Sequence, residues 1–289
     1  MSTRAASDAL VPFARPRRST CAPFALLLAL LLAGCGGGAP LLHPARTLAA
    51  GDIRAASGVS ANVAAGSLGD DLRAAKDAST RDPSAPGLPG TNAAYAKGAL
   101  VAAAIAPGLA PFVGARVGVG NQYEGGVAYT GRAVRADLRR SFDDGKVSFS
   151  VGLGLSAALY GRQQGSDLPN VDLGALHGYG FDIPLLIGWE SNGGIYKVWG
   201  GGRGGFERDV IESVRSEPKP VPLGPPPIHL DANRYWGAAV VGLATGFNHV
   251  HVAIELSAAY QVVTGNYNEN HVTVRGITLA PATALWWTF

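Results

Sequence analysis

Ionisable side chains that could do chemistry recur at alternate positions along this sequence. Arg135, Asp137 and Arg139 alternate in one stretch, and His251 and Glu255 lie four residues apart near the C-terminus. On a β-strand, His251 and Glu255 would share a face about 13 Å apart, which is too far for a direct acid/base pair. The spacing of the histidines and carboxylates also does not require the three convergent ligands of a metal site. We therefore expect no catalytic residue and no metal site here.

The wider set of ionisable residues expected on the inward faces of strands contains both signs of charge in comparable number. It comprises Arg116, Glu124, Arg135, Asp137, Arg139, Asp182, Arg203, Glu207, His251 and Glu255. A barrel of about eight to ten strands has an interior filled by side chains. We therefore expect ion pairs and hydrogen bonds to fill the lumen, and a narrow or gated polar pore is the alternative.

The stretch 249–289 shows most clearly which elements would position these side chains. Apolar residues alternate with small or polar ones, which is typical of a β-strand with one apolar face. In residues 249–262 the apolar face consists of Val250, Val252, Ile254, Leu256, Ala258, Tyr260 and Val262. The last strand places Leu285, Trp287 and the terminal Phe289 on one face, and a bulge could absorb the interruption at Pro281.

The same alternation and the turn signals predict the remaining strands. They cover residues 52–64, 99–119, 123–129, 132–142, 147–160, 176–190, 195–208 and 235–246. Prolines in 99–119 allow one bent strand or two strands with a tight turn. Long connections are expected near 65–95, where Leu68, Leu72 and Ala75 could line a short helix, and at the proline-rich 209–231. One bent strand at 99–119 gives ten strands, and eight or twelve are the alternatives.

The composition and the N-terminus indicate an exported protein. Glycine makes up 40 of 289 residues and only 16% of residues are charged. Residues 1–34 combine several arginines with a short leucine-rich run, as in a signal peptide, and the run is too short to span a bilayer. Cys21 lies in this leader, so the mature chain would keep only Cys35. The formal net charge of +3, without a basic stripe, gives no support to nucleic-acid binding.

Two motifs resemble those of bacterial outer-membrane β-barrel lipoproteins of an uncharacterised proteobacterial family. Leu32-Ala33-Gly34-Cys35 looks like a lipobox, and Leu285, Trp287 and Phe289 resemble a C-terminal barrel-assembly signal. The resemblance implies a lipid on Cys35, a tether at 35–50, and an all-β, up-and-down antiparallel barrel at 51–289. It also implies insertion by the barrel-assembly machinery into outer-membrane lipid, with both termini in the periplasm.

The motifs of known outer-membrane barrel enzymes are missing from the sequence. Omptin-type proteases use Asp-x-Asp and Asp-x-His pairs and lipid A deacylases use His-x-Ser, and none of these occurs here. We therefore expect a structural or surface-recognition barrel without a cofactor, whose long loops meet an external ligand. A channel for small or lipophilic solutes is the first alternative, and an outer-membrane lipid-modifying enzyme is the second.

Overall fold

Ten antiparallel strands close into one barrel in the computed structural model, which describes residues 39–81, 93–159, 168, 171, 173–212, 229–247, 249–268 and 270–289. Each strand pairs with its neighbours in sequence, and β1 pairs with β10 to close the ring. The strands are β1 (Ile53–Ala65), β2 (Gly108–Gly120), β3 (Tyr123–Tyr129), β4 (Ala133–Asp144), β5 (Val147–Ala158), β6 (Leu176–Glu190), β7 (Tyr196–Glu212), β8 (His229–Phe247), β9 (Val250–Tyr267) and β10 (Asn270–Thr288). The expected all-β, ten-stranded, up-and-down barrel is confirmed.

The outer face of the barrel is an apolar belt to which every strand contributes. One exposed aliphatic residue from each strand in turn is Val59, Val113, Val127, Leu138, Leu153, Leu185, Val198, Val241, Ile254 and Leu285. Ile254 is 58% exposed and Leu285 is 51% exposed. Fully burying such a side chain gains about 1.5–3 kcal/mol relative to leaving it in water. A continuous belt of this kind therefore favours hydrocarbon as the surrounding solvent.

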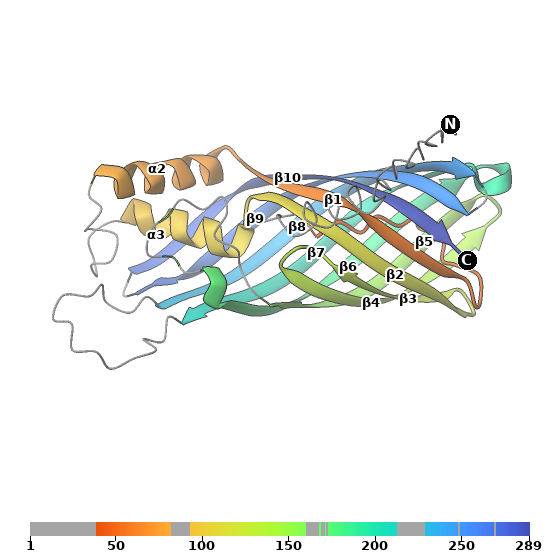
Figure 1. Cartoon of the computed structure of the whole chain (residues 1–289), viewed down its shortest axis with the longest axis horizontal. Helices are drawn as coiled ribbons and strands as arrows, with labels where there is room; N and C mark the ends of the chain where they lie inside the picture. The colour runs from red at the N-terminus through yellow and green to blue at the C-terminus, as the bar shows by residue number, and fades with distance from the viewer. Residues whose placement is uncertain are drawn as a thin grey trace, which may run out of the picture.

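The two ends of the barrel differ in their connections (Figure 1). The turn end carries the tight turns after β2, β4, β6 and β8, together with the start of β1 and the end of β10. Asn121 and Gln122 both adopt positive φ, 50° and 63°, in the two-residue turn after β2, as a type I′ hairpin requires. The helix end carries α2 (Ser67–Arg81), α3 (Ala93–Leu100) and the π-helix η2 (Val101–Ile105) between β1 and β2. No described helix is long and apolar enough to cross a bilayer.

Three expectations about the strands need correction. Residues 99–105 belong to α3 and η2 rather than to a bent strand, and this helical stretch ends at Ala106, which has the left-handed conformation, before β2 begins. Residues 209–212 and 229–231 continue β7 and β8, so the proline-rich connection is shorter than expected. β10 pairs with β9 in one register past Pro281, so no bulge forms there. The helix near Leu68 and Ala75 is present as α2.

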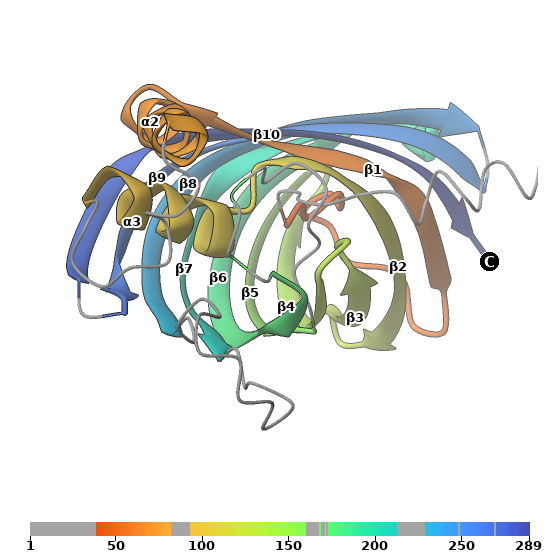
Figure 2. The same cartoon turned by 60° about the vertical axis from the view of Figure 1, so that its left-hand side comes forward.

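Two apolar clusters fill the barrel at different heights. At the helix end, α3 and η2 pack against inward residues of β6 to β10, among them Leu176, Ile211 and Val263. At the turn end, Leu41 and Leu42 pack against inward residues that include Phe112, Trp199 and Trp286. Figure 2 shows the red-orange chain before β1 inside the ring of strands, with α3 at the opposite end. The barrel therefore holds two inserts, one in each half.

Candidate functional site in the barrel lumen

The insert at the turn end is residues 39–50, which we call the luminal segment. It belongs to no helix or strand, and Leu41, Leu42, His43 and Ala45 are each at most 3% exposed. The segment leaves the lumen at the turn end, where the Gly51 N–H donates to the Gly118 carbonyl at 2.9 Å. A Cβ at Gly118 would lie 1.9 Å from the Ala49 carbonyl oxygen, so only glycine allows this close approach.

Buried ionisable side chains of the barrel hold the luminal segment by its backbone. The Leu41 and Leu42 N–H groups donate to the two carboxylate oxygens of Glu255, at 2.7 and 2.8 Å. The Leu48 N–H donates to Glu124 at 2.8 Å. Arg139 donates to the Pro44 carbonyl and Arg203 to the Ala39 carbonyl. Because backbone groups are strong and obligatory hydrogen-bonding groups, these contacts satisfy a chain that belongs to no strand.

An aromatic layer lies beside the luminal segment. The rings of Trp199 and Trp286 stack with centroids 5.8 Å apart, and the Trp199 Nε1 donates to Glu255 at 3.2 Å. The Arg54 guanidinium lies 4.8 Å from the Trp286 ring centroid. Both tryptophans are 1% exposed, so the layer closes the lumen at this height.

The insert at the helix end is η2, whose backbone carbonyls accept hydrogen bonds from side chains of the barrel. Arg132 donates to the Ala103 carbonyl at 2.6 Å, and Arg234 donates to the Ala104 carbonyl at 2.7 Å. Asn62 donates to the Ile105 carbonyl at 2.6 Å. All five residues of η2 are buried. A π-helix is rare and often marks a functional position.

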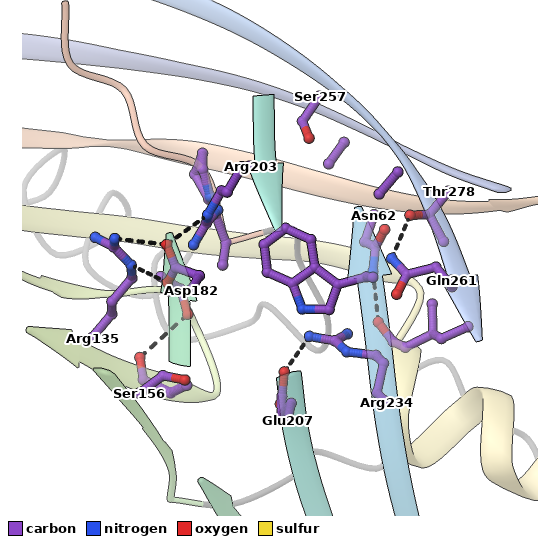
Figure 3. Close-up of a pocket in the computed structure, with 18 of the residues that line it drawn as sticks. Asn62, Arg135, Ser156, Asp182, Arg203, Glu207, Arg234, Ser257, Gln261 and Thr278 are labelled. Atoms are coloured by element: carbon purple, nitrogen blue, oxygen red, sulfur yellow. Dashed lines mark hydrogen bonds and ion pairs between the residues drawn. The ribbon is translucent and has the colours of Figure 1, made fainter. Parts of the chain in front are cut away.

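A cavity of about 80 Å³ lies between the two inserts (Figure 3). Ala39 and Pro40 of the luminal segment line it on one side, and Ile105 of η2 lines it on the other. Among the described residues, four guanidinium groups and two carboxylates line the cavity: Arg132, Arg135, Arg203, Arg234, Asp182 and Glu207.

The ion pairs around the cavity fall into two groups. Asp182 accepts from Arg135 and from Arg203, each at 2.9 Å, and Arg203 also stacks over the Trp236 ring at 4.9 Å. Glu207 pairs with both Arg132 and Arg234. Three of the four arginines that line the cavity therefore also hold an insert: Arg203 holds Ala39, and Arg132 and Arg234 hold η2.

All residues of the expected lumen network lie on inward faces of the strands. Five of them form one connected set of ion pairs on β2, β3 and β4: Arg116, Glu124, Arg135, Asp137 and Arg139. His251 forms no ion pair among the described residues, and its Nε2 is 3.0 Å from the Gly194 carbonyl oxygen. Leu285 and Trp287 face outward on β10, and Phe289 is 66% exposed at the chain end. Cys35 lies outside the described residues.

Sequence reasoning missed four charged members of the lumen, Arg54, Arg132, Asp209 and Arg234. Arg132 lies one residue before β4. Asp209 lies within the connection expected at 209–231, and Arg234 lies just after it. Extending the strand alternation by one residue, from 208 to 209 and from 235 to 234, places Asp209 and Arg234 inward. The luminal position of residues 39–50 has no strand periodicity and gives no such signal.

The comparisons with known proteins leave the family open. No protein-family model matches the chain, and no curated protein matches it. Among solved structures, Neisserial surface protein A (NspA) is 9% identical, with a TM-score of 0.33, over 82% of this chain and 96% of that chain. The outer membrane protease OmpT from Escherichia coli is 10% identical, with a TM-score of 0.36, over 82% and 97%. The site is therefore interpreted from its own geometry.

Proposed function

We propose that this protein is an outer-membrane β-barrel with a structural or surface-recognition role and a lumen closed at rest. The apolar belt on all ten strands supports the membrane location. The packing inside the barrel supports a lumen closed at rest, because the luminal segment, the tryptophan layer and η2 block the lumen at successive heights. An external ligand would therefore bind outside the lumen.

The helix end is the part that we assign to the cell surface. Outer-membrane barrels have short periplasmic turns and longer external loops, and the connection between β1 and β2 folds here into α2, α3 and η2. α2 presents Asp70, Arg73, Lys76 and Asp77 to solvent. An external ligand would meet this polar helix and the neighbouring connections.

The membrane attachment has two further parts in this proposal. Cys35 would carry a lipid, since the Leu32 to Cys35 motif has the form of a lipobox. Leu285, Trp287 and Phe289 would be recognised by the barrel-assembly machinery, and their exposure on the outer face supports this role. Both termini would lie on the periplasmic side.

Planar-bilayer conductance tests the closed lumen. The purified barrel should give no stable, large open state at moderate voltage. A steady high conductance in most insertions would contradict the proposal. Heat-modifiable migration in a denaturing gel should accompany the measurement, because only a folded barrel resists the detergent.

A narrow channel for small solutes is the second candidate, and the cavity lined by charged side chains between the two inserts favours it. The lipid-modifying alternative has less support, because the lumen carboxylates that the structure describes are already paired with arginine or with backbone N–H groups. We therefore propose a non-enzymatic barrel. The lipid A mass spectrum of a deletion strain should match that of the parent strain.

A further inference from the structure

An apolar groove lies on the outer face of β6, β7 and β8, toward the helix end. Its lining residues are Phe181, Ile183, Gly204, Gly205, Phe206 and Tyr235. The floor continues along the outward side of β7, where Gly200, Gly202 and Gly204 stand at alternate positions. β6 supplies one wall through the exposed Ile183 and Leu185, which face these glycines in the register. The floor is therefore one strand wide and about 13 Å long between Gly200 and Gly204.

The barrel itself does not need glycine on this floor. A Cβ built on Gly202 or Gly204 meets no heavy atom closer than 3.7 Å, and one on Gly237 of β8 meets none within 4 Å. The neighbouring Gly201 differs, because its Cβ would lie 2.0 Å from the Leu185 carbonyl oxygen. Glycine inside a strand weakens the strand and often marks the close approach of a ligand. The outward glycines are therefore explained by a body that lies against β7 from outside.

An aromatic row closes the groove toward the helix end. Phe181, Phe206 and Tyr235 face one another across β6, β7 and β8, and successive ring centroids are 6.1 and 5.0 Å apart. Phe181 is 45% exposed and Tyr235 is 56% exposed, so the row faces outward. Aromatic residues of membrane barrels gather at the interface between hydrocarbon and headgroups. In a membrane, the groove would therefore lie at hydrocarbon depth, just below the headgroups.

The next row toward the helix end consists of polar donors. Arg208 of β7 faces Tyr179 of β6 on one side and Asn233 of β8 on the other. Arg208 is exposed and forms no ion pair with any residue that the structure describes. Asp231, in the row beyond, already accepts from Asn266 at 2.9 Å. Guanidinium, phenol and amide groups all donate to phosphate oxygens, and a guanidinium group can do so with two hydrogen bonds. A phosphate group therefore fits this row.

The groove, the aromatic row and the polar row match the parts of one lipid. An acyl chain in the groove would pass the aromatic row, and a phosphate in its headgroup would meet Arg208. A second barrel fits this surface less well, because a symmetric dimer in a membrane would place both Arg208 guanidinium groups at the same height in one interface. The helix end is the end that we assign to the cell surface. The outer leaflet there consists mainly of lipid A, a glycolipid with phosphate groups and several acyl chains.

We propose that the outer face of β6, β7 and β8 is a binding site for lipid A, in which Arg208 binds a phosphate and the glycine floor receives an acyl chain. Tyr179 and Asn233 supply further donors to the headgroup. The choice of lipid A rests on the proposed orientation in the outer membrane. Binding in detergent solution tests the site without membrane insertion, so its failure would leave the membrane location and the closed lumen untouched.

Native mass spectrometry of the purified barrel in detergent provides the measurement, with bis-phosphorylated lipid A as the probe. One lipid A per barrel should bind saturably. Arg208→Gln should raise the dissociation constant by roughly tenfold or more, because charge-assisted hydrogen bonds are lost. Arg275→Gln, which removes an exposed arginine of β10 at the same end, is the control and should leave it nearly unchanged. Lipid A without phosphates should bind the parent protein as weakly as the phosphorylated form binds Arg208→Gln.

Gly204→Leu tests the groove, because the new side chain would fill it without meeting the barrel. Binding should weaken, whereas Ala115→Leu, at an exposed outward position of β2, should bind as the parent does. Heat-modifiable migration shows that each variant is folded. Unchanged binding in folded Arg208→Gln and Gly204→Leu, or equal losses in the two controls, would overturn the site. Equally tight binding of phosphatidylglycerol would overturn the choice of lipid A, and barrel dimers that Gly204→Leu separates would assign the groove to a second copy.

Discussion

Glu255 is the residue on which the luminal segment depends most. Its carboxylate accepts three buried donors, the Leu41 and Leu42 N–H groups and the Trp199 Nε1. Glu255→Ala should leave these donors unpaired and weaken the luminal position by about 3 kcal/mol. Trypsin should then cleave after Arg46 many times faster than in the parent protein. Ser257→Ala, an inward residue of the same strand, is the control. Equal cleavage in the two variants would contradict the role of Glu255.

His43 gives the luminal segment a pH dependence. Burial and the guanidinium groups of Arg139, Arg116 and Arg135 hold the pKa of His43 well below its ordinary value of 6.5. Above pH 6.5 the histidine is neutral in the lumen and in a released segment, so it adds no pH dependence. Below pH 6.5 only the released form gains a proton, so the luminal position weakens by up to about 1.4 kcal/mol per pH unit.

Iodide quenching of tryptophan fluorescence measures this effect, because a released segment uncovers Trp199 and Trp286. Quenching should rise between pH 7.5 and 5.5, and His43→Gln should remove most of the rise. The same pH dependence in both proteins would show that another group is responsible.

The sequence predicts residues well where strand alternation governs them and poorly elsewhere. Glu124, Asp182 and Glu255 follow from alternation, because a barrel strand has only an inward and an outward face. Their partners do not follow, since a pair such as Glu255 with Leu41 joins residues that no local pattern connects.

At the level of elements, the sequence shows where strands lie but not what fills the barrel. The ten strands are visible because each must keep one apolar face toward lipid. The helical nature of 99–105 is hidden, because alanine and valine in a buried insert have no alternation to reveal it. Residues 39–50 fall within the tether expected at 35–50, but their charged partners come from β3, β4, β7 and β9.

The whole molecule combines an apolar outer belt, a charged interior and two inserts within one closed sheet. Charged outward residues such as Arg140 and Arg275 stand toward the ends of their strands, where a membrane interface would lie. The barrel is thus arranged with an apolar face outside and a largely filled lumen inside. We propose the helix end, where α2 is exposed, as the functional surface.

Labelling of single cysteines in intact cells tests this arrangement most directly. Asp77 lies on α2 at the helix end and Asn192 lies in a tight turn at the turn end, and both are exposed. In Asp77→Cys, a membrane-impermeant maleimide should react at once, whereas Asn192→Cys should react only after the outer membrane is permeabilised. Protection of both positions until permeabilisation, or labelling of Asn192→Cys alone, would contradict a membrane-spanning barrel with its helices outside.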